Sequence, residues 1–357
     1  MHSTLRVGVV GAGRMCQRAH IPNLLAEKCH IVGLADTRYE TAKLVAAHFR
    51  IPQVFGRYED LLGRDDVDAL VAAVPDPFHA EIAVAALEAG KHVFIEKPMA
   101  TNSGDGRKMV EVAKRTGRRL SIAYQRRHDP AAQITKRLVD EFAGSGEMGR
   151  IRYMELKNFG GDWTWNSDPL IDAGDTSPER GADPRFPSWL PEHLRGQFAV
   201  YNNGLTHGID LIQHLVGAPT AVIAAYPDYS ATTMALFDWG GIRTLVAAAP
   251  TEGSIWQEWL EIRYERGWLR LSTPPSLHVN RPGVVEVYRG GKGVMERYEA
   301  AHEWAFRREM QHFLRCVREG VPESPTPEEA LLNVMIVEDL FRQAVRMPEP
   351  HPIGRPG

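Results

Sequence analysis

A short apolar run that ends in a glycine turn constrains the fold of this chain more than any other feature. Residues 5–10 are rich in valine and lead into Gly11-Ala12-Gly13, and residues 19–28 then have a helical pattern. An apolar run bounded by glycines is typical of a strand buried on both faces of a sheet. Glycine lets the backbone approach a pyrophosphate closely, and the following helix start, with Arg14 and Met15, supplies N–H groups. The segment therefore predicts a dinucleotide-binding turn.

Strand and helix patterns alternate through the first third of the chain, which predicts right-handed crossovers and a mostly parallel sheet. The expected strands are 5–10, 31–35, 67–74, 92–95 and 119–123, and the expected helices are 19–28, 39–48, 79–89 and 104–116. After one more helix at 131–142, strands follow one another at 151–158, 221–226, 232–238, 243–248, 256–264, 268–272 and 284–288. Adjacent strands without helices between them predict a second domain with a mainly antiparallel sheet. Late helices are expected at 303–319 and 327–345.

The predicted fold class is therefore α/β, an N-terminal Rossmann domain with a parallel sheet plus a second α+β domain with a large mainly antiparallel sheet. The 357 residues correspond to roughly two domains at about 150 residues each. We place the dinucleotide-binding domain at 1–124 and a domain for substrate binding and oligomerisation at 125–325. A C-terminal helix and tail at 326–357 are expected to pack back on the Rossmann domain. Residues 162–197 read as a long loop, which in a compact chain is usually functional or part of an assembly.

Composition excludes several classes of protein. Lysine plus arginine (42) against aspartate plus glutamate (45) gives a formal charge of −3, which argues against a general nucleic-acid binder. The three cysteines lack CxxC spacing, and the histidines lack HxxxH or HxxE spacing, so we expect no disulfide framework and no metal. No secretory signal and no long apolar run is visible. We expect a cytoplasmic protein with no membrane partner.

Asp36 follows the second strand, about 20 residues after the glycine turn. A carboxylate at this place can accept both hydroxyls of an adenosine ribose and would repel a 2′-phosphate. Asp36 therefore favours NAD over NADP. Arg38 leaves NADP open, because a guanidinium could accept that phosphate.

Four features together resemble the Gfo/Idh/MocA family, which contains glucose–fructose oxidoreductase and inositol dehydrogenase. They are the glycine turn, the stretch Val74-Pro75-Asp76-Pro77-Phe78-His79, the stretch Glu96-Lys97-Pro98, and His207-Gly208-Ile209-Asp210. The resemblance covers nearly the whole chain. It implies that Pro75, Asp76 and His79 lie against the cofactor and that Glu96 and Lys97 sit at the nicotinamide ribose. It also implies that Lys97 reaches the substrate hydroxyl, although a surface lysine after a strand is the alternative.

The resemblance assigns a second site around His207. The family usually has Asp-x-Gly-x-His-x-x-Asp there, whereas this chain has Asn203 and Leu205 in place of the aspartate and the glycine. Asparagine can hydrogen-bond a sugar hydroxyl but cannot take a proton. Acid–base work is therefore expected from His207, with its ordinary pKa near 6.5, unless this histidine only caps a helix or fills the core. Asp210 is expected to orient the helix or the imidazole.

The residues after the last Rossmann strand are expected to reach the cleft. Tyr124 and Arg126 are candidates for substrate binding, Gln125 for cofactor binding, and Trp163 and Trp165 for packing against a sugar ring or for core and subunit contacts. The resulting hypothesis is an NAD-dependent dehydrogenase of a sugar, sugar derivative or cyclitol, with Lys97 and His207 as catalytic residues, in a homodimer or homotetramer. One alternative is a glycoside-cleaving or epimerising enzyme that recycles tightly bound NAD. The second is a non-catalytic regulatory protein that binds NAD or a sugar.

Overall fold

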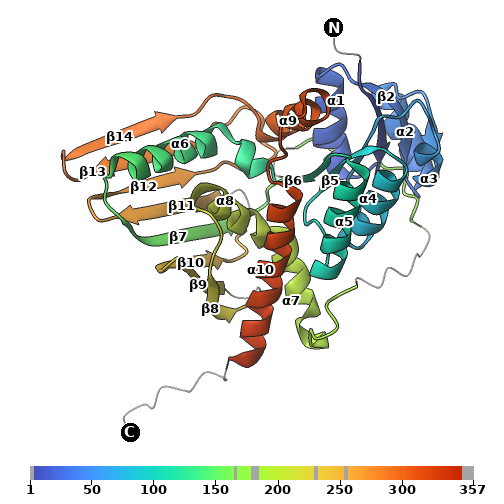
Figure 1. The fold of residues 1–357 in the computed structure, drawn as a ribbon. Helices are drawn as coiled ribbons and strands as arrows, with labels where there is room; N and C mark the ends of the chain where they lie inside the picture. The colour runs from blue at the N-terminus through green and yellow to red at the C-terminus, as the bar shows by residue number, and fades with distance from the viewer. Residues whose placement is uncertain (1–3, 165–166, 178–184, 229–231, 253–255, 348–357) are drawn as a thin grey trace.

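The computed structural model describes residues 4–164, 167–177, 185–228, 232–252 and 256–347, which form two sheets with helices around them (Figure 1). The first sheet is parallel, with strand order β3-β2-β1-β4-β5-β6. Its strands are β1 (Arg6–Val10), β2 (His30–Ala35), β3 (Val54–Phe55), β4 (Ala69–Ala72), β5 (His92–Glu96) and β6 (Leu120–Ala123). The predicted Rossmann domain is confirmed.

Helices cover both faces of this sheet, because successive side chains of a strand point to opposite faces. Val7 and Val9 of β1 pack on one side, whereas Val10 packs on the other. The helical elements of this domain are η1 (Cys16–His20), α1 (Ile21–Ala26), α2 (Tyr39–Phe49), α3 (Glu59–Leu62), η2 (Asp76–Phe78), α4 (His79–Glu88) and α5 (Ser103–Thr116). The side of Val7 is covered by η1, α1, α2 and the late helix α9 (Ala305–Glu319), and the opposite side by α4, α5 and α10 (Pro327–Arg346).

The second sheet has strand order β14-β13-β12-β11-β7-β10-β9-β8 and is antiparallel except for the β7–β10 pair. This agrees with the predicted mainly antiparallel sheet. Its strands are β7 (Ile151–Gly160), β8 (Ala221–Tyr226), β9 (Thr233–Trp239), β10 (Ile242–Ala248), β11 (Trp256–Tyr264), β12 (Gly267–Ser272), β13 (Val284–Arg289) and β14 (Val294–Glu299).

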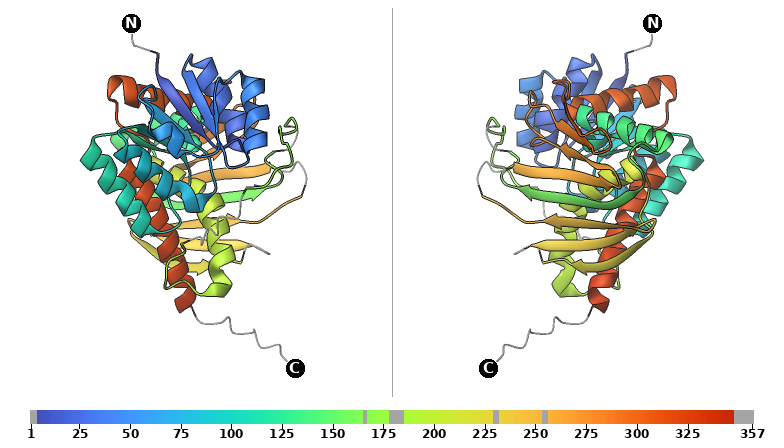
Figure 2. Two further views of the ribbon diagram at one scale, coloured as in Figure 1. Left: turned by 90° about the vertical axis from the view of Figure 1, so that its right-hand side faces the viewer. Right: turned by 90° about the vertical axis from the view of Figure 1, so that its left-hand side faces the viewer.

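Helices lie on one face of this sheet, and the views in Figure 2 show the strands stacked beside them. These helical elements are η3 (Gln125–His128), α6 (Pro130–Ser145), η4 (Glu192–Leu194), α7 (Arg195–Val200), η5 (Tyr201–Leu205) and α8 (Thr206–Val216). Phe142 of α6, Ile212 of α8 and Phe341 of α10 belong to the same core as Phe237 and Leu269 of the sheet. The helices α6, α8 and α10 therefore bury the inner face of the second sheet.

Several elements differ from the sequence-based expectation. The strands β3 and β14 were not predicted, and the helical run from residue 192 to residue 216 overlaps the end of the expected loop. Asn202, Asn203 and Gly204 are poor helix formers, which hides the continuity of α7 and α8. In the structure these residues form the π-helical turn η5 that joins the two helices.

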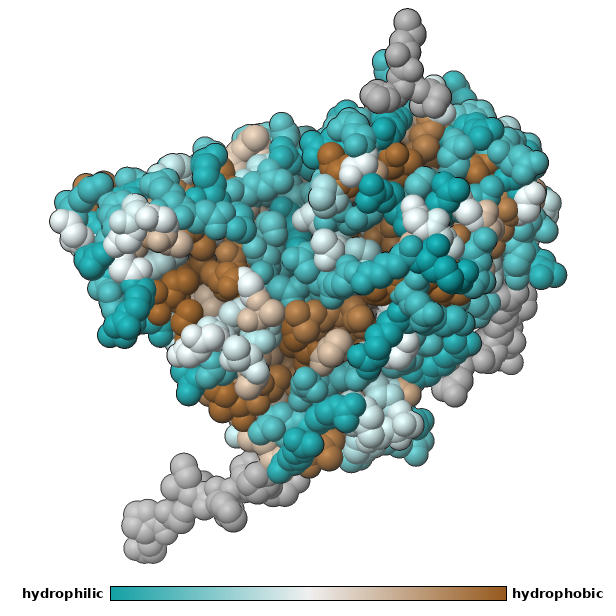
Figure 3. All heavy atoms as spheres, viewed as in Figure 1, coloured by the Kyte–Doolittle hydropathy of each residue, from teal (hydrophilic) through white to brown (hydrophobic). Residues whose placement is uncertain are grey.

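The helix α10 contacts both halves of the molecule. The Ser103 backbone N–H and hydroxyl donate to Glu338 at 2.6 and 3.0 Å, and Gln343 donates to the Ile223 carbonyl at 2.9 Å. Figure 3 shows the molecular surface in the same view as Figure 1. Apolar residues gather in the middle of this face, and polar residues cover most of the Rossmann helices. Within the described residues, no helix is long and apolar enough to cross a membrane. The predicted domain boundaries and oligomeric state stay predictions.

The contact of α8 with β7 depends on Gly208. A Cβ atom at this position would lie 2.2 Å from Cδ2 of Leu156, which is buried. We expect Gly208→Ala to lower the free energy of unfolding by about 1–2 kcal/mol, because the added methyl group overpacks this contact. Gly204→Ala is the matched control, since a Cβ atom there meets nothing within 4 Å. Equal urea midpoints for the two variants would contradict this packing analysis.

Candidate active site

A cavity of about 760 Å³ opens at the carboxyl ends of the Rossmann strands and continues to the second sheet. In open parallel sheets this edge is the usual place for a ligand. Of the residues predicted for the site, the lining includes Gly11, Gly13, Arg14, Met15, Asp36, Arg38, Pro75, Asp76, Glu96, Lys97, Gln125, Arg126, Trp163, Asn203 and His207. The chain thus brings most of the predicted cofactor and substrate residues to one cavity.

The glycine turn has the shape that a dinucleotide requires. Gly11 has a φ of +100°, and a Cβ atom there would lie 2.2 Å from the carbonyl oxygen of Ala73. Its own N–H donates to the Ala35 carbonyl at 2.8 Å, which ties the turn to the end of β2. Cys16, which stands where the usual fingerprint has its third glycine, is fully buried behind the turn. Only glycine fits at position 11, and the turn presents a close backbone approach to the cavity.

Asp36 stands at the end of β2 with its carboxylate largely buried. One carboxylate oxygen accepts the Ala12 N–H at 2.6 Å, and the other accepts the Arg38 N–H at 2.7 Å. The Arg38 guanidinium lies 3.3 Å from the first of these oxygens. The carboxylate therefore holds the glycine turn in shape while facing the cavity, and it keeps the neighbouring guanidinium turned toward itself.

Lys97 is held at the far end of the cavity by residues of both domains. Its ammonium donates to the backbone carbonyl and to the side-chain Oδ1 of Asn203, at 2.9 and 3.0 Å. The Asn203 amide in turn donates to Asp76 at 3.2 Å. Burial lowers the pKa of Lys97, although the charges of Glu96 and Asp76 oppose this shift. The amine is thus a positioned donor whose proton is easier to remove than that of an ordinary lysine.

Glu96 is buried behind Lys97. Its Oε1 lies 2.9 Å from Nε2 of His20, and its Oε2 accepts the Lys97 N–H at 3.2 Å. Burial alone would raise the pKa of Glu96, but the hydrogen bond from His20 and the nearby positive charge of Lys97 hold it below the ordinary value. The carboxylate is therefore a fixed negative charge next to the lysine.

His207 lies at the start of α8 and lines the same cavity as Lys97. Its Nδ1 is buried and has no hydrogen-bond partner within the described part of the chain. Burial, together with the positive charges of Lys97 and Arg126, lowers the pKa of His207 well below 6.5. The imidazole is therefore neutral near pH 7 and can accept a proton.

Asp210 orients the helix rather than the imidazole. Its two carboxylate oxygens accept from Arg127 at 2.8 Å each, and one of them also accepts from Asn333 at 2.7 Å. Both members of the Arg127–Asp210 pair are buried. The pair fixes α8, and with it His207, against the segment that leaves the Rossmann sheet.

Three other predicted residues have side chains that are buried or already paired, so they are not free to bind a ligand in the cavity. Tyr124 is fully buried, and its hydroxyl lies 2.8 Å from that of Thr206. His79 is also buried, between the carbonyls of Val74 and Pro98 at 2.9 and 2.7 Å. Arg126 reaches the lining, but its guanidinium forms a buried ion pair with Glu258. Trp165 lies outside the described residues.

Sequence reasoning missed several lining residues from the second sheet and the late segments. They are Asn158, Gly160, Gly161, Trp256, Ser276 and Phe306. Asn158 lies near the end of β7 and Trp256 begins β11, and the antiparallel pairing of the two strands sets Trp256 opposite Gly160. The one sequence signal for Asn158 and Trp256 is their position at the ends of the expected strands 151–158 and 256–264. Across the part of the chain that the structure describes, no three His, Cys, Asp or Glu side chains could hold a metal ion.

Comparison with known proteins finds relatives of the N-terminal part of the chain. Residues 5–124 match the model of the GFO_IDH_MocA oxidoreductase family with an NAD-binding Rossmann fold. An inositol 2-dehydrogenase of Corynebacterium glutamicum is 35% identical over 154 residues, which are 42% of this chain and 44% of that protein. A dTDP-3,4-didehydro-2,6-dideoxy-alpha-D-glucose 3-reductase of Actinomadura kijaniata is 36% identical over 149 residues, 42% of this chain and 43% of that one. The matched region thus spans less than half the length of these curated relatives.

Solved structures extend the likeness of fold to the second domain. The crystal structure of a 3-ketoreductase from Actinomadura kijaniata in complex with NADP and TDP-benzene superposes with a TM-score of 0.74 at 22% identity. The superposition covers 96% of this chain and 98% of that one. This similarity concerns the fold. The family match of residues 5–124 agrees with the resemblance that the sequence motifs predict.

Proposed function

We propose that this protein is an NAD-dependent oxidoreductase that transfers a hydride between a hydroxyl-bearing carbon of a sugar, sugar derivative or cyclitol and nicotinamide. One observation carries the proposal. Lys97 from the Rossmann domain and His207 from the second domain line the same cavity as the glycine turn. Alcohol oxidation needs a proton acceptor, a donor that holds the oxygen and a place for the dinucleotide, and these groups can supply all three.

The residues that would hold the cofactor follow from the lining. Gly11, Gly13 and the helix start after them would receive the pyrophosphate, and Asp36 the adenosine ribose. Glu96 and Lys97 lie at the opposite end, where the reactive ring would stand. When bound there, nicotinamide supplies the acceptor for the hydride that leaves the substrate carbon.

Lys97 and His207 divide the work on the substrate oxygen. The lysine ammonium has three N–H donors, and the contacts with Asn203 use two of them. The third is available to hold the oxygen and to stabilise negative charge as it develops there. His207 takes the hydroxyl proton, because its neutral imidazole is the acceptor on the second-domain side of the cavity.

The substrate class rests on the lining and on the relatives. Trp163 and Trp256 offer flat apolar surfaces to the C–H face of a ring, and Asn158 offers an amide to hydroxyl groups. The relatives named above are an inositol dehydrogenase and a sugar reductase. We therefore propose a polyhydroxylated ring as the substrate.

The first prediction concerns the two proposed catalytic residues. We expect Lys97→Ala and His207→Ala each to lower kcat by about 10²-fold or more, because each removes a group that acts on the reacting oxygen. A panel of sugars and cyclitols, followed by NADH absorbance, identifies the substrate and then measures both variants. Lys136→Ala, which removes a half-exposed lysine of α6 away from the cavity lining, serves as the control. Wild-type turnover in either active-site variant would contradict the assignment.

The pH dependence of kcat/KM gives a second prediction. Activity requires neutral His207, so it should fall with acidification only through a pKa well below 6.5. Activity also requires protonated Lys97, so it should fall with rising pH through a pKa below 10.5. We expect a broad plateau between these limits. His207→Asn should abolish the acidic limb in whatever activity remains, and an unchanged limb would assign it to another group.

The third prediction concerns the choice between NAD and NADP. Asp36→Ser removes the carboxylate that would meet the ribose hydroxyls, so we expect the ratio of NADPH to NADH affinity to rise about tenfold or more. Fluorescence titration with each reduced nucleotide measures the ratio without turnover. Asp65→Ser, at an exposed position away from the cavity lining, controls for the loss of a surface charge. An unchanged ratio would remove Asp36 from this role.

A further inference from the structure

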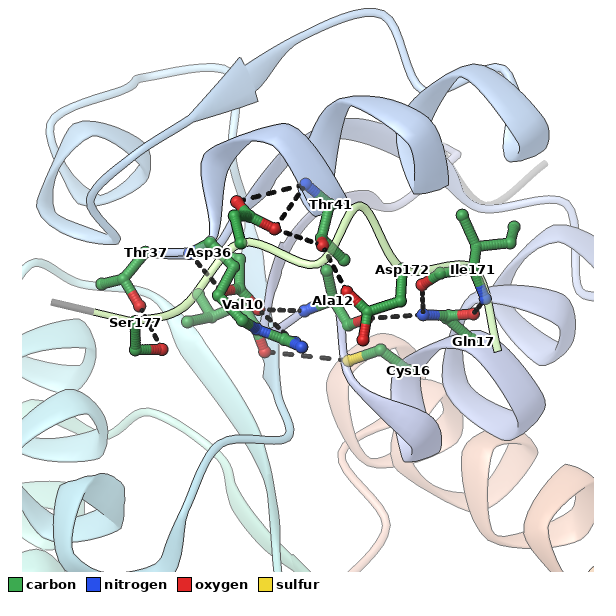
Figure 4. A network of polar contacts seen from close by, with 12 residues as sticks. Val10, Ala12, Cys16, Gln17, Asp36, Thr37, Thr41, Ile171, Asp172 and Ser177 are labelled. Atoms are coloured by element: carbon green, nitrogen blue, oxygen red, sulfur yellow. Dashed lines mark hydrogen bonds and ion pairs between the residues drawn. The ribbon is translucent and has the colours of Figure 1, made fainter. Parts of the chain in front are cut away.

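A segment of the second domain lies across the nucleotide end of the Rossmann domain. Residues 168–177, which we call the strap, belong to the connection between β7 and η4 and pass over the starts of η1 and α2 (Figure 4). The hydrogen bonds of the Lys97 side chain go to Asn203, not to the strap. The strap meets the opposite end of the cavity, where the residues after β2 stand.

The first half of the strap is fastened to the helix below the glycine turn. The Gln17 side chain donates to the Ile171 carbonyl and accepts the Ile171 N–H, both at 2.9 Å. The same amide donates to the Ala12 carbonyl at 2.7 Å. The Arg18 guanidinium donates to the carbonyls of Asp168 and Pro169. One glutamine thus joins the strap directly to the phosphate-binding turn.

The second half of the strap caps α2. Asp175 Oδ2 accepts the Glu40 N–H at 2.9 Å, and Asp175 Oδ1 accepts the Thr41 N–H at 3.2 Å. The Thr41 hydroxyl, fully buried, lies 2.5 Å from Asp175 and 3.1 Å from Asp172, and it accepts the Ala173 N–H at 3.0 Å. A carboxylate from another domain therefore occupies the positive end of this helix.

The strap also borders the cavity itself. Ser177 lines it together with Asp36, Thr37 and Arg38, and its hydroxyl oxygen accepts from Thr37 at 3.0 Å. Hydrogen bonds from the Gly174 N–H and the Thr41 hydroxyl lower the pKa of the Asp172 carboxyl. Hydrogen bonds from the Thr41 hydroxyl and from the Glu40 and Thr41 N–H groups lower the pKa of the Asp175 carboxyl, so both carboxyls are ionised near pH 7. Negative charge thus collects at the first turn of α2, which directly follows the cavity-lining residues Asp36, Thr37 and Arg38.

We propose that the strap is a second determinant of cofactor choice and retention, in which Asp175 excludes a 2′-phosphate and the closed strap slows nucleotide release. The inference rests on the proposed function and deepens it at the same cavity. A 2′-phosphate would have to stand near the first turn of α2, whose N–H groups are already used by Asp175. A ribose with a free 2′-hydroxyl carries no charge and avoids this repulsion.

The positions of the hydrogen bonds that hold the strap explain why it would slow nucleotide release. Its contacts with Gln17 and Thr41 attach it to the helix after the glycine turn and to α2, and its contact with Thr37 lies at the cavity lining. A nucleotide whose adenosine lies beneath Ser177 leaves only after some of these contacts open. The strap is part of the same chain, so it closes again without a partner.

Two substitutions of Asp175 separate the effect of its charge from the effect of its hydrogen bonds to α2. Asp175→Asn keeps an oxygen that can cap α2 but removes the charge, so we expect NADPH to bind about three- to tenfold more tightly while NADH affinity changes little. Asp175→Ala removes the cap as well, so we expect the NADH release rate to rise about fivefold or more. Fluorescence titration and stopped-flow displacement of the reduced nucleotides measure both effects. Asp140→Asn, an exposed carboxylate of α6, is the control.

The results distinguish a failure of the strap proposal from a failure of the proposed function. If both nucleotides bind and neither the affinity ratio in Asp175→Asn nor the release rate in Asp175→Ala changes, the strap has no role in cofactor binding. If wild-type protein binds neither nucleotide, the proposed function itself fails, and the inference fails with it. Should Asp175→Ala not fold, Ser177→Ala, which removes only the hydroxyl facing Thr37, tests retention in its place.

Discussion

The buried ion pair between Arg127 and Asp210 is the interaction on which the site depends. Arg127 follows the last strand of the Rossmann sheet, and Asp210 lies one turn after His207 on α8. Asn333 and Glu329 of α10 complete the pair. A buried ion pair contributes little net stability compared with apolar packing, but removing one partner leaves an uncompensated charge. Its effect here is therefore geometric, since it sets the position of His207 relative to Lys97.

Local features of the site could be read from the sequence, whereas contacts between distant segments could not. The glycine turn and Lys97 are specified by neighbours in the chain, a strand before and a helix or proline after, so their place at the sheet edge was predictable. The partners of Asp210 were not, because Arg127 and Asn333 are brought to it only by tertiary packing. Glu258 behind Arg126 was hidden for the same reason. The residues of the strap carried no signal beyond the unusual length of their loop.

The two ends of the cavity differ in charge, with a carboxylate at the nucleotide end and an ammonium at the far end. The nucleotide end is lined by the carboxylate of Asp36, which suits neutral ribose hydroxyls, and Asp175 of the strap caps the neighbouring helix α2. The glycine turn between the two ends suits phosphate. The far end carries the ammonium of Lys97, which favours a developing negative charge on oxygen, whereas the Arg126 guanidinium there is paired with Glu258. The same fold thus separates recognition of the cofactor from chemistry on the substrate.

Asn203 places a neutral amide, instead of a second carboxyl group, beside Asp76 and Lys97 at the far end of the cavity. Its carbonyl oxygen accepts from Lys97 and its amide nitrogen donates to Asp76, so the two charged groups fix which way the amide points. An aspartate at this position would place a second carboxylate beside Asp76 and raise the pKa of Lys97 by adding negative charge. The neutral amide avoids that repulsion and leaves the ammonium with a lowered pKa. Because the amide does not take up a proton near neutral pH, the proton of the substrate hydroxyl is left to the neutral imidazole of His207.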